Sequence, residues 1–128
     1  MKAQVATEYL FVIGLILAIL TPILYYATSE SSNALNLNDA QDTAQTLAKT
    51  ADYVYSLGPG TSNKVTINMP PGIKNVTISG KEITLKTSQY GDVVGISKAN
   101  LTGNISSSQG IYEIIIKTLD TGIVSITQ

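Results

Sequence analysis

The chain opens with a long run of apolar residues that carries no charge. The run extends over residues 10–27 and is apolar on every side of a helix rather than along one stripe. A helix of this kind must be buried all round, either in a large protein core or in a bilayer. At about eighteen residues it is just long enough to span the hydrocarbon layer. Pro22 inside it predicts a kink or a locally weakened hydrogen-bond ladder, and Tyr25 and Tyr26 stand where interfacial aromatic residues belong.

A second pattern follows between residues 37 and 54, where apolar residues recur every three or four positions. The opposite side is polar, so this segment predicts an amphipathic helix that packs on a core. Half of the apolar stripe is alanine, so the element that packs on it is expected to approach closely. Gly58-Pro59-Gly60 then predicts the end of the helix. The apolar stripe consists of Leu37, Ala40, Ala44, Leu47, Ala51 and Val54.

After residue 58, apolar and polar residues alternate in short segments, which is typical of half-buried strands. Segments 75–78 and 82–86 flank Ser79-Gly80-Lys81, which predicts a tight hairpin. Segment 111–117 is partly apolar on both faces and predicts a central strand, whereas Leu101 to Gly110 predicts a surface loop. The other predicted strands are 64–69, 93–96 and 123–127.

One long helix followed by five or six short strands predicts an α+β fold. We expect the helix, apolar in its first half and amphipathic in its second, to pack on a C-terminal antiparallel β-sheet or small β-sandwich. The predicted organisation is a long helix over residues 4–57, with 10–27 as its membrane-length segment, followed by a β-rich head domain over residues 58–128.

Composition removes several classes of function. The chain has eight lysines and no arginine, nine carboxylates and a net charge of −1, and its lysines are scattered, so a nucleic-acid interface is not expected. It has no cysteine and no histidine, which excludes thiol nucleophiles, imidazole acid–base chemistry and the usual zinc sites. Neither a phosphate-binding loop nor a dinucleotide fingerprint is present. We therefore expect no enzyme activity, no cofactor and no metal site.

Glu8 is the exceptional residue at the start of the apolar run. A carboxylate at the centre of a membrane helix costs about 2.5–3.5 kcal/mol on insertion scales, so such a residue suggests a function and a cationic partner. Three interpretations of the segment remain open at this point. It is a simple membrane anchor with Glu8 at the membrane surface, or a secretory signal peptide with a cleavage signal at Ala27-Thr28-Ser29, or a segment retained for assembly. Glu8 beside a single nearby lysine, Lys2, disfavours the signal peptide.

The residues Gln4-Val5-Ala6-Thr7-Glu8-Tyr9, followed by the apolar helix, resemble the class III signal peptide of archaeal type IV pilin-like proteins. The resemblance covers about a fifth of the chain. It implies that a prepilin peptidase cuts between Ala3 and Gln4 and removes the leader 1–3, which is shorter and less basic than such leaders usually are. It also implies that the apolar helix remains on the mature protein, with Glu8 at the fifth mature position.

The resemblance further implies what the segment does. Cleavage before Gln4 frees an α-amino group, which is positive below about pH 8, and Glu8 of one subunit would pair with this amine on its neighbour during assembly. The implied partners are further copies of the chain in a helical homopolymer, the prepilin peptidase, the pilus assembly platform, and the membrane before assembly. The implied filament-core residues are Leu10, Phe11, Ile13, Leu15, Leu17, Leu20 and Pro22.

The function expected from this resemblance is that of a structural subunit of an extracellular type IV pilus-like filament, for adhesion or surface attachment. The alternative is a membrane-anchored or secreted β-domain surface protein that never polymerises. Asn75, Asn100 and Asn104 each begin an Asn-X-Ser/Thr sequence, so they are candidate N-glycosylation sites on an extracellular protein.

Overall fold

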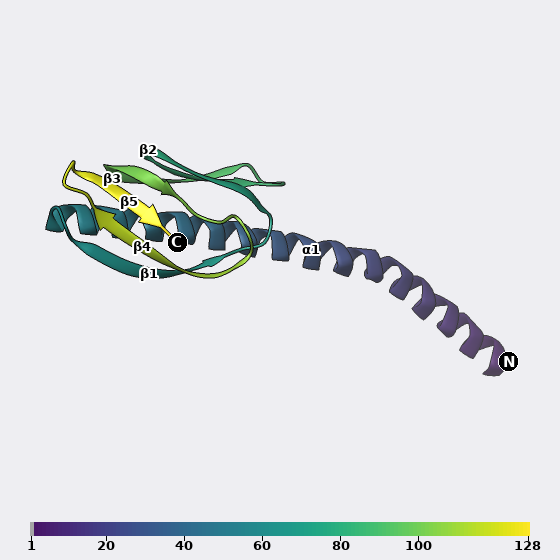
Figure 1. Cartoon of the computed structure of the whole chain (residues 1–128). Helices are drawn as coiled ribbons and strands as arrows, with labels where there is room; N and C mark the ends of the chain where they lie inside the picture. Colours follow the sequence, from purple (N-terminus) through teal and green to yellow (C-terminus); the bar gives the residue numbers. More distant parts are fainter. Residues whose placement is uncertain (1) are drawn as a thin grey trace. The chain divides into compact units, whose positions relative to one another are not determined.

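The computed structural model describes residues 2–128, except for the side chains of residues 2 and 32–35. Met1, the first residue of the expected leader, lies outside the described residues. The chain divides into two compact units at the boundary between Leu35 and Asn36, and each is described by itself. The first unit is helical. The second unit, residues 36–128, contains the rest of the helix and five strands (Figure 1). It is called the head below, so this name includes residues 36–57 of the helix as well as the predicted β-rich domain 58–128.

Helix α1 (Lys2–Leu57) confirms the prediction of one long N-terminal helix. It ends where expected, because Gly58 and Gly60 adopt φ values of 96° and 86°. These positive values are incompatible with an α-helix and are rarely adopted by residues other than glycine. In the head, the predicted apolar stripe lies against the sheet. Ala40, Ala44, Leu47, Ala51 and Val54 are fully buried, and Leu37 packs at the margin of the same core.

The alanine stripe allows a close contact between α1 and strand β3 (Asp92–Asn104). A Cβ atom on Gly95 would overlap the backbone carbonyl group of Ala44. The two backbones therefore approach as closely as a glycine facing an alanine permits, which is the close approach that the stripe predicts.

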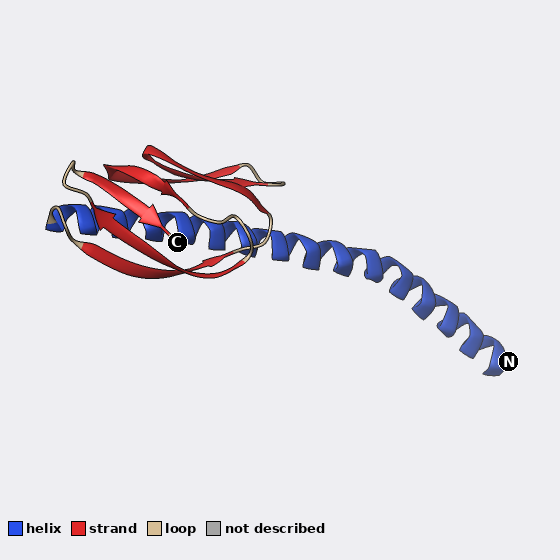
Figure 2. Cartoon of the chain, in the orientation of Figure 1, coloured by secondary structure: helices blue, strands red, loops and turns tan. Residues whose placement is uncertain are grey.

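The strands form one mixed sheet in the order β1-β4-β5-β3-β2, and the α+β fold is confirmed (Figure 2). β1 (Ser62–Met69) pairs antiparallel with β4 (Gly110–Thr118), which pairs antiparallel with β5 (Ile123–Thr127). β5 then pairs parallel with the C-terminal part of β3, from Asn100↔Ile123 to Asn104↔Thr127. This parallel pair is the feature that separates the sheet from the fully antiparallel arrangement expected from the sequence.

Strand β2 (Ile73–Thr87) folds back on itself, as the hairpin prediction requires. An extended strand of this length would place its ends roughly 50 Å apart. Instead, the amide of Ser88 donates a 2.9 Å hydrogen bond to the carbonyl of Gly72, so the two ends lie side by side. The turn is at Gly80, whose φ of 60° suits a glycine at the first central position of a hairpin turn. Figures 1 and 2 show this reversal.

Two expectations for the strands need correction. The segment from Leu101 to Gly110 is not entirely a surface loop, because β3 continues to Asn104 and Ile105 is 4% exposed. The short strand predicted at 93–96 is therefore the start of a much longer one. Parallel pairing with β5 supplies the hydrogen bonds that the Ser- and Gly-rich sequence did not suggest.

The predicted central strand, 111–117, lies inside the sheet as β4 but on one side of the central strand β5. Its inner residues Ile114 and Ile116 are fully buried, whereas Ile111 is 74% exposed on the outer face. β4 therefore has apolar residues on both faces, but only one of these faces is buried in this chain.

Candidate membrane and assembly segment

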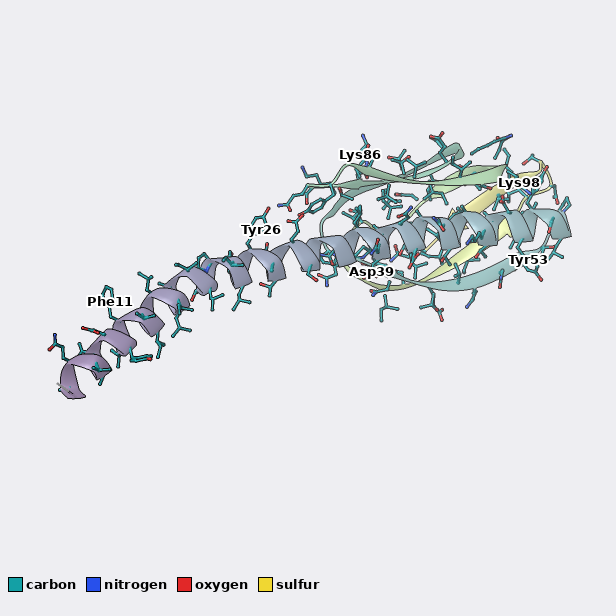
Figure 3. All side chains as sticks on the ribbon, turned by 180° about the vertical axis from the view of Figure 1, so that it is seen from behind. Phe11, Tyr26, Asp39, Tyr53, Lys86 and Lys98 are labelled. Atoms are coloured by element: carbon teal, nitrogen blue, oxygen red, sulfur yellow. The ribbon has the colours of Figure 1, made fainter. Side chains whose placement is uncertain are left out.

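The first unit presents an apolar surface that its own chain leaves uncovered. The large apolar side chains from Val5 to Tyr26 are 44–77% exposed, with Leu20 at the lower limit and Tyr25 at the upper. Figure 3 shows Phe11 and Tyr26 standing out from α1. By length and composition α1 can cross a membrane, and none of its most apolar stretch is buried within the chain. The segment is therefore not the core helix of this head, and it suggests membrane insertion or secretion.

The threonine hydroxyl groups of this part of α1 are satisfied inside the helix. Thr7 donates to the carbonyl of Ala3 at 2.9 Å, and Thr21 donates to that of Leu17 at 2.7 Å. Thr28 makes the same type of bond, to Leu24 at 3.1 Å. A hydroxyl in lipid would otherwise lack a hydrogen-bond partner, so these bonds make the segment compatible with a hydrocarbon environment.

Pro22 does not interrupt the helix. α1 is continuous across it, although proline has no N–H to donate to the carbonyl four residues earlier. That carbonyl belongs to Ala18, whereas the neighbouring Thr21 hydroxyl donates to the carbonyl of Leu17.

Glu8 lies on the surface of α1 and is exposed, as are Ala3 and Gln4. Among the side chains that the structure describes, the ion pair present joins Lys64 and Glu113 on the head, at 3.9 Å, and Glu8 has no cationic partner among them. The Ala3–Gln4 peptide bond lies in the first turn of α1. The exposed carboxylate of Glu8 is therefore accessible to another molecule or to the aqueous surface of a membrane.

The three candidate glycosylation sites lie on the head and are exposed. Asn75 is on β2, while Asn100 and Asn104 are on β3. Asn100 and Asn104 are four residues apart and therefore share one face of the strand.

A polar groove of about 210 Å³ lies between α1 and the edge of β1. Asp39 and Asp42 supply its carboxylates, and Thr43 closes one side by donating a 3.1 Å hydrogen bond to the carbonyl of Asn68. Over the described residues, no group of three or more His, Cys, Asp or Glu side chains is placed to hold a metal ion. The groove therefore offers two exposed carboxylates.

Sequence reasoning missed one polar contact that organises the head. Asp52 of α1 accepts hydrogen bonds from the Ser97 hydroxyl and from the Lys98 amide of β3. Asp52 lies between the buried Ala51 and Val54, so its position near the buried stripe was the available signal. The identity of its partners depends on how β3 crosses the helix.

These features define the chain as a long N-terminal helix, apolar in its first half, whose second half packs on a C-terminal mixed β-sheet. No protein-family model matches the sequence, and neither a curated protein nor a solved structure shows significant similarity to it.

Proposed function

We propose that this protein is a structural subunit of an archaeal type IV pilus-like filament that polymerises through its N-terminal helix. The observation that carries the proposal is the uncovered apolar half of α1, joined to a head with its own core. Such a surface requires either lipid or other apolar helices around it. This architecture is compatible with that of type IV pilins, and the Gln4-to-Tyr9 resemblance supports the same class.

In this proposal the apolar segment remains covered during assembly. It would leave the bilayer and enter a bundle of identical helices, exchanging lipid contacts for helix contacts. Its self-satisfied threonine hydroxyls add no unpaired polar group in either environment. Head-to-tail contacts between identical subunits then generate an open helical polymer.

Glu8 sets the alignment of neighbouring subunits in the proposed filament. Processing at Ala3–Gln4 creates an amine, and the exposed Glu8 carboxylate of the next subunit is available to pair with it. A buried carboxylate without its partner is strongly destabilising, by about 3–5 kcal/mol. Misaligned subunits are therefore rejected.

The head domains would coat the filament at the cell surface and mediate adhesion. Their exposed Asn75, Asn100 and Asn104 would carry N-linked glycans. The prepilin peptidase and the pilus assembly platform would be the partners during export and polymerisation.

The rival function is a membrane anchor for a head that never polymerises. The same uncovered helix supports it, because α1 can cross a membrane by itself. In a simple anchor, Glu8 only meets water or lipid headgroups, so its charge is dispensable once the chain is inserted.

The experiment compares Glu8→Gln with Glu30→Gln in the cells that make the protein. Both residues are exposed carboxylates of the same helical unit, and both variants lose one negative charge. We expect Glu8→Gln to abolish filaments in electron micrographs while membrane-fraction levels are retained, and Glu30→Gln to leave filaments intact. Intact-mass measurement should give a mature chain that starts at Gln4. Normal filaments from Glu8→Gln would refute the role of Glu8, and a wild-type chain that never forms filaments would refute the proposed function.

A further inference from the structure

The sheet of the head is interrupted within β3. The pairing of β2 with β3 runs through Ile96, opposite Glu82, and resumes at Leu101, opposite Gly80. The parallel pairing with β5 begins only at Asn100. Residues 97–99 consequently have a partner strand on neither side, although they lie in the middle of a thirteen-residue strand.

This interruption separates two parts of the sheet. One part, named here the meander, is the folded-back β2 together with residues 92–96 of β3. The other part comprises β1, β4, β5 and residues 100–104 of β3. Between the two parts, backbone pairing beyond residues 97–99 is limited to Gly80 with Leu101 at the hairpin turn, so contacts with α1 are the main restraint on their common arrangement.

Asp52 supplies the polar contact at the interruption. Its Oδ1 atom accepts a 2.6 Å hydrogen bond from the Ser97 hydroxyl and a 2.7 Å hydrogen bond from the Lys98 amide. The Ser97 Oγ atom in turn accepts a 3.1 Å hydrogen bond from the Ala99 amide. Two amides that lack a strand partner are thus satisfied by one carboxylate and one hydroxyl. Figure 3 shows Lys98 of β3 near the C-terminal turns of α1, which carry Tyr53.

The site is partly sheltered, with Lys98 exposed and the residues on either side of it buried. Ser97 is 2% exposed and Ala99 is 1% exposed, and Asp52 is half-buried. Hydrogen bonds to a charged acceptor stabilise more than neutral ones, and an amide left unpaired in such a place is costly. Just before the interruption, Gly95 of β3 packs closely against Ala44 of α1. This is a second contact between β3 and the helix, next to the one that Asp52 makes.

We propose that Asp52 is a clasp that fastens the interruption at residues 97–99 to α1, and that the meander opens as a separate unit when the clasp is released. Local opening in contiguous cooperative units is a general property of folded proteins. Here the boundary of the unit is the place where strand pairing stops and a helix side chain replaces it. This inference concerns the head alone and does not depend on filament formation.

The test is native-state hydrogen exchange of the full chain in detergent micelles, comparing Asp52→Ala with Asp42→Ala. Asp42 is an exposed carboxylate on the same helix, so the control removes the same charge. We expect Asp52→Ala to accelerate exchange of the Lys98 amide and of the amides of 82–86 and 92–96 by roughly 10- to 100-fold. The paired amides of β1 and β4 should keep their wild-type rates, and Asp42→Ala should change neither group.

Two further variants separate the clasp from a general loss of stability. Asp52→Asn retains an acceptor oxygen and should accelerate the meander amides less than Asp52→Ala. Ser97→Ala removes one donor to Asp52 and should accelerate exchange of the same amides as Asp52→Ala, by a smaller factor. If Asp52→Ala does not fold, Ser97→Ala tests the proposal in its place. Equal acceleration of the meander and of β1 and β4 in Ser97→Ala, or no acceleration in either Asp52 variant, would overturn the proposal.

Discussion

Two buried threonines of the head differ in whether the side-chain hydroxyl has a hydrogen-bond partner. The Thr43 hydroxyl donates to the Asn68 carbonyl, and Thr43 is 6% exposed. Thr118 is 1% exposed, and its hydroxyl is the buried side-chain oxygen that lacks a partner among the described residues. The backbone of Thr118 is fully used, because its amide bonds to Thr61 and its carbonyl accepts from Gly60. Only the side-chain oxygen is therefore unfavourable.

The same substitution at these two positions should have opposite effects. Thr118→Val removes an unsatisfied buried hydroxyl and should raise the free energy of unfolding by about 1 kcal/mol. Thr43→Val leaves the Asn68 carbonyl without its donor and should lower the free energy by about 1 kcal/mol. Thermal unfolding of the detergent-solubilised chain, followed by near-ultraviolet circular dichroism, measures both. A loss of stability in Thr118→Val would show that its hydroxyl has a bonding role.

At the scale of elements, the contact between α1 and β3 determines how the head is assembled. Gly95 faces the backbone of Ala44, while the neighbouring Val94 points outward and is 44% exposed. A helix backbone cannot move locally to accommodate an extra atom without disturbing its neighbours. The closeness of the two elements therefore depends on the absence of one Cβ.

Gly95→Ala should destabilise the head by about 1–3 kcal/mol, as overpacked core substitutions do. Val94→Ala on the same strand is the control, and its effect should be below about 1 kcal/mol because the side chain is largely exposed. Both values follow from thermal or denaturant unfolding. An unchanged stability of Gly95→Ala would mean that α1 and β3 can separate at no cost.

At the scale of the whole molecule, the two units have opposite requirements. Every buried apolar residue of the described chain lies between Ala40 and Ile126, within the head. In the helical unit that ends at Leu35, the large apolar side chains from Val5 to Tyr26 are uncovered. The head therefore carries its own folding core, and the first unit depends on lipid or on other chains.

A fragment of residues 36–128 should be monomeric in aqueous buffer and unfold in one cooperative transition, because it retains the whole core. The full chain should require detergent to remain dispersed. Size-exclusion chromatography with light scattering and thermal unfolding test the two forms. Aggregation or an absence of cooperative unfolding in the fragment would show that residues before 36 contribute to the core.

Much of this architecture follows from local patterns in the sequence. The apolar run 10–27, the alanine stripe, the helix end at Gly58 and the turn at Gly80 are consequences of side-chain periodicity and glycine chemistry within a few residues. These features could be derived because each depends on neighbours along the chain.

The tertiary structure decided the features that join distant residues. Asp52 and Ser97 are 45 positions apart, and no spacing rule connects them. The parallel pairing of β3 with β5 gave strand structure to Leu101–Asn104, which looks like a loop by composition. The Gly95–Ala44 contact and the unpaired Thr118 hydroxyl likewise depend on which strand crosses which turn of α1. Sequence by itself determined most of the helix, strand and turn segments, because those preferences are local. Strand order and the partners of buried polar groups came only with the fold, because they are set by packing among elements far apart in the chain.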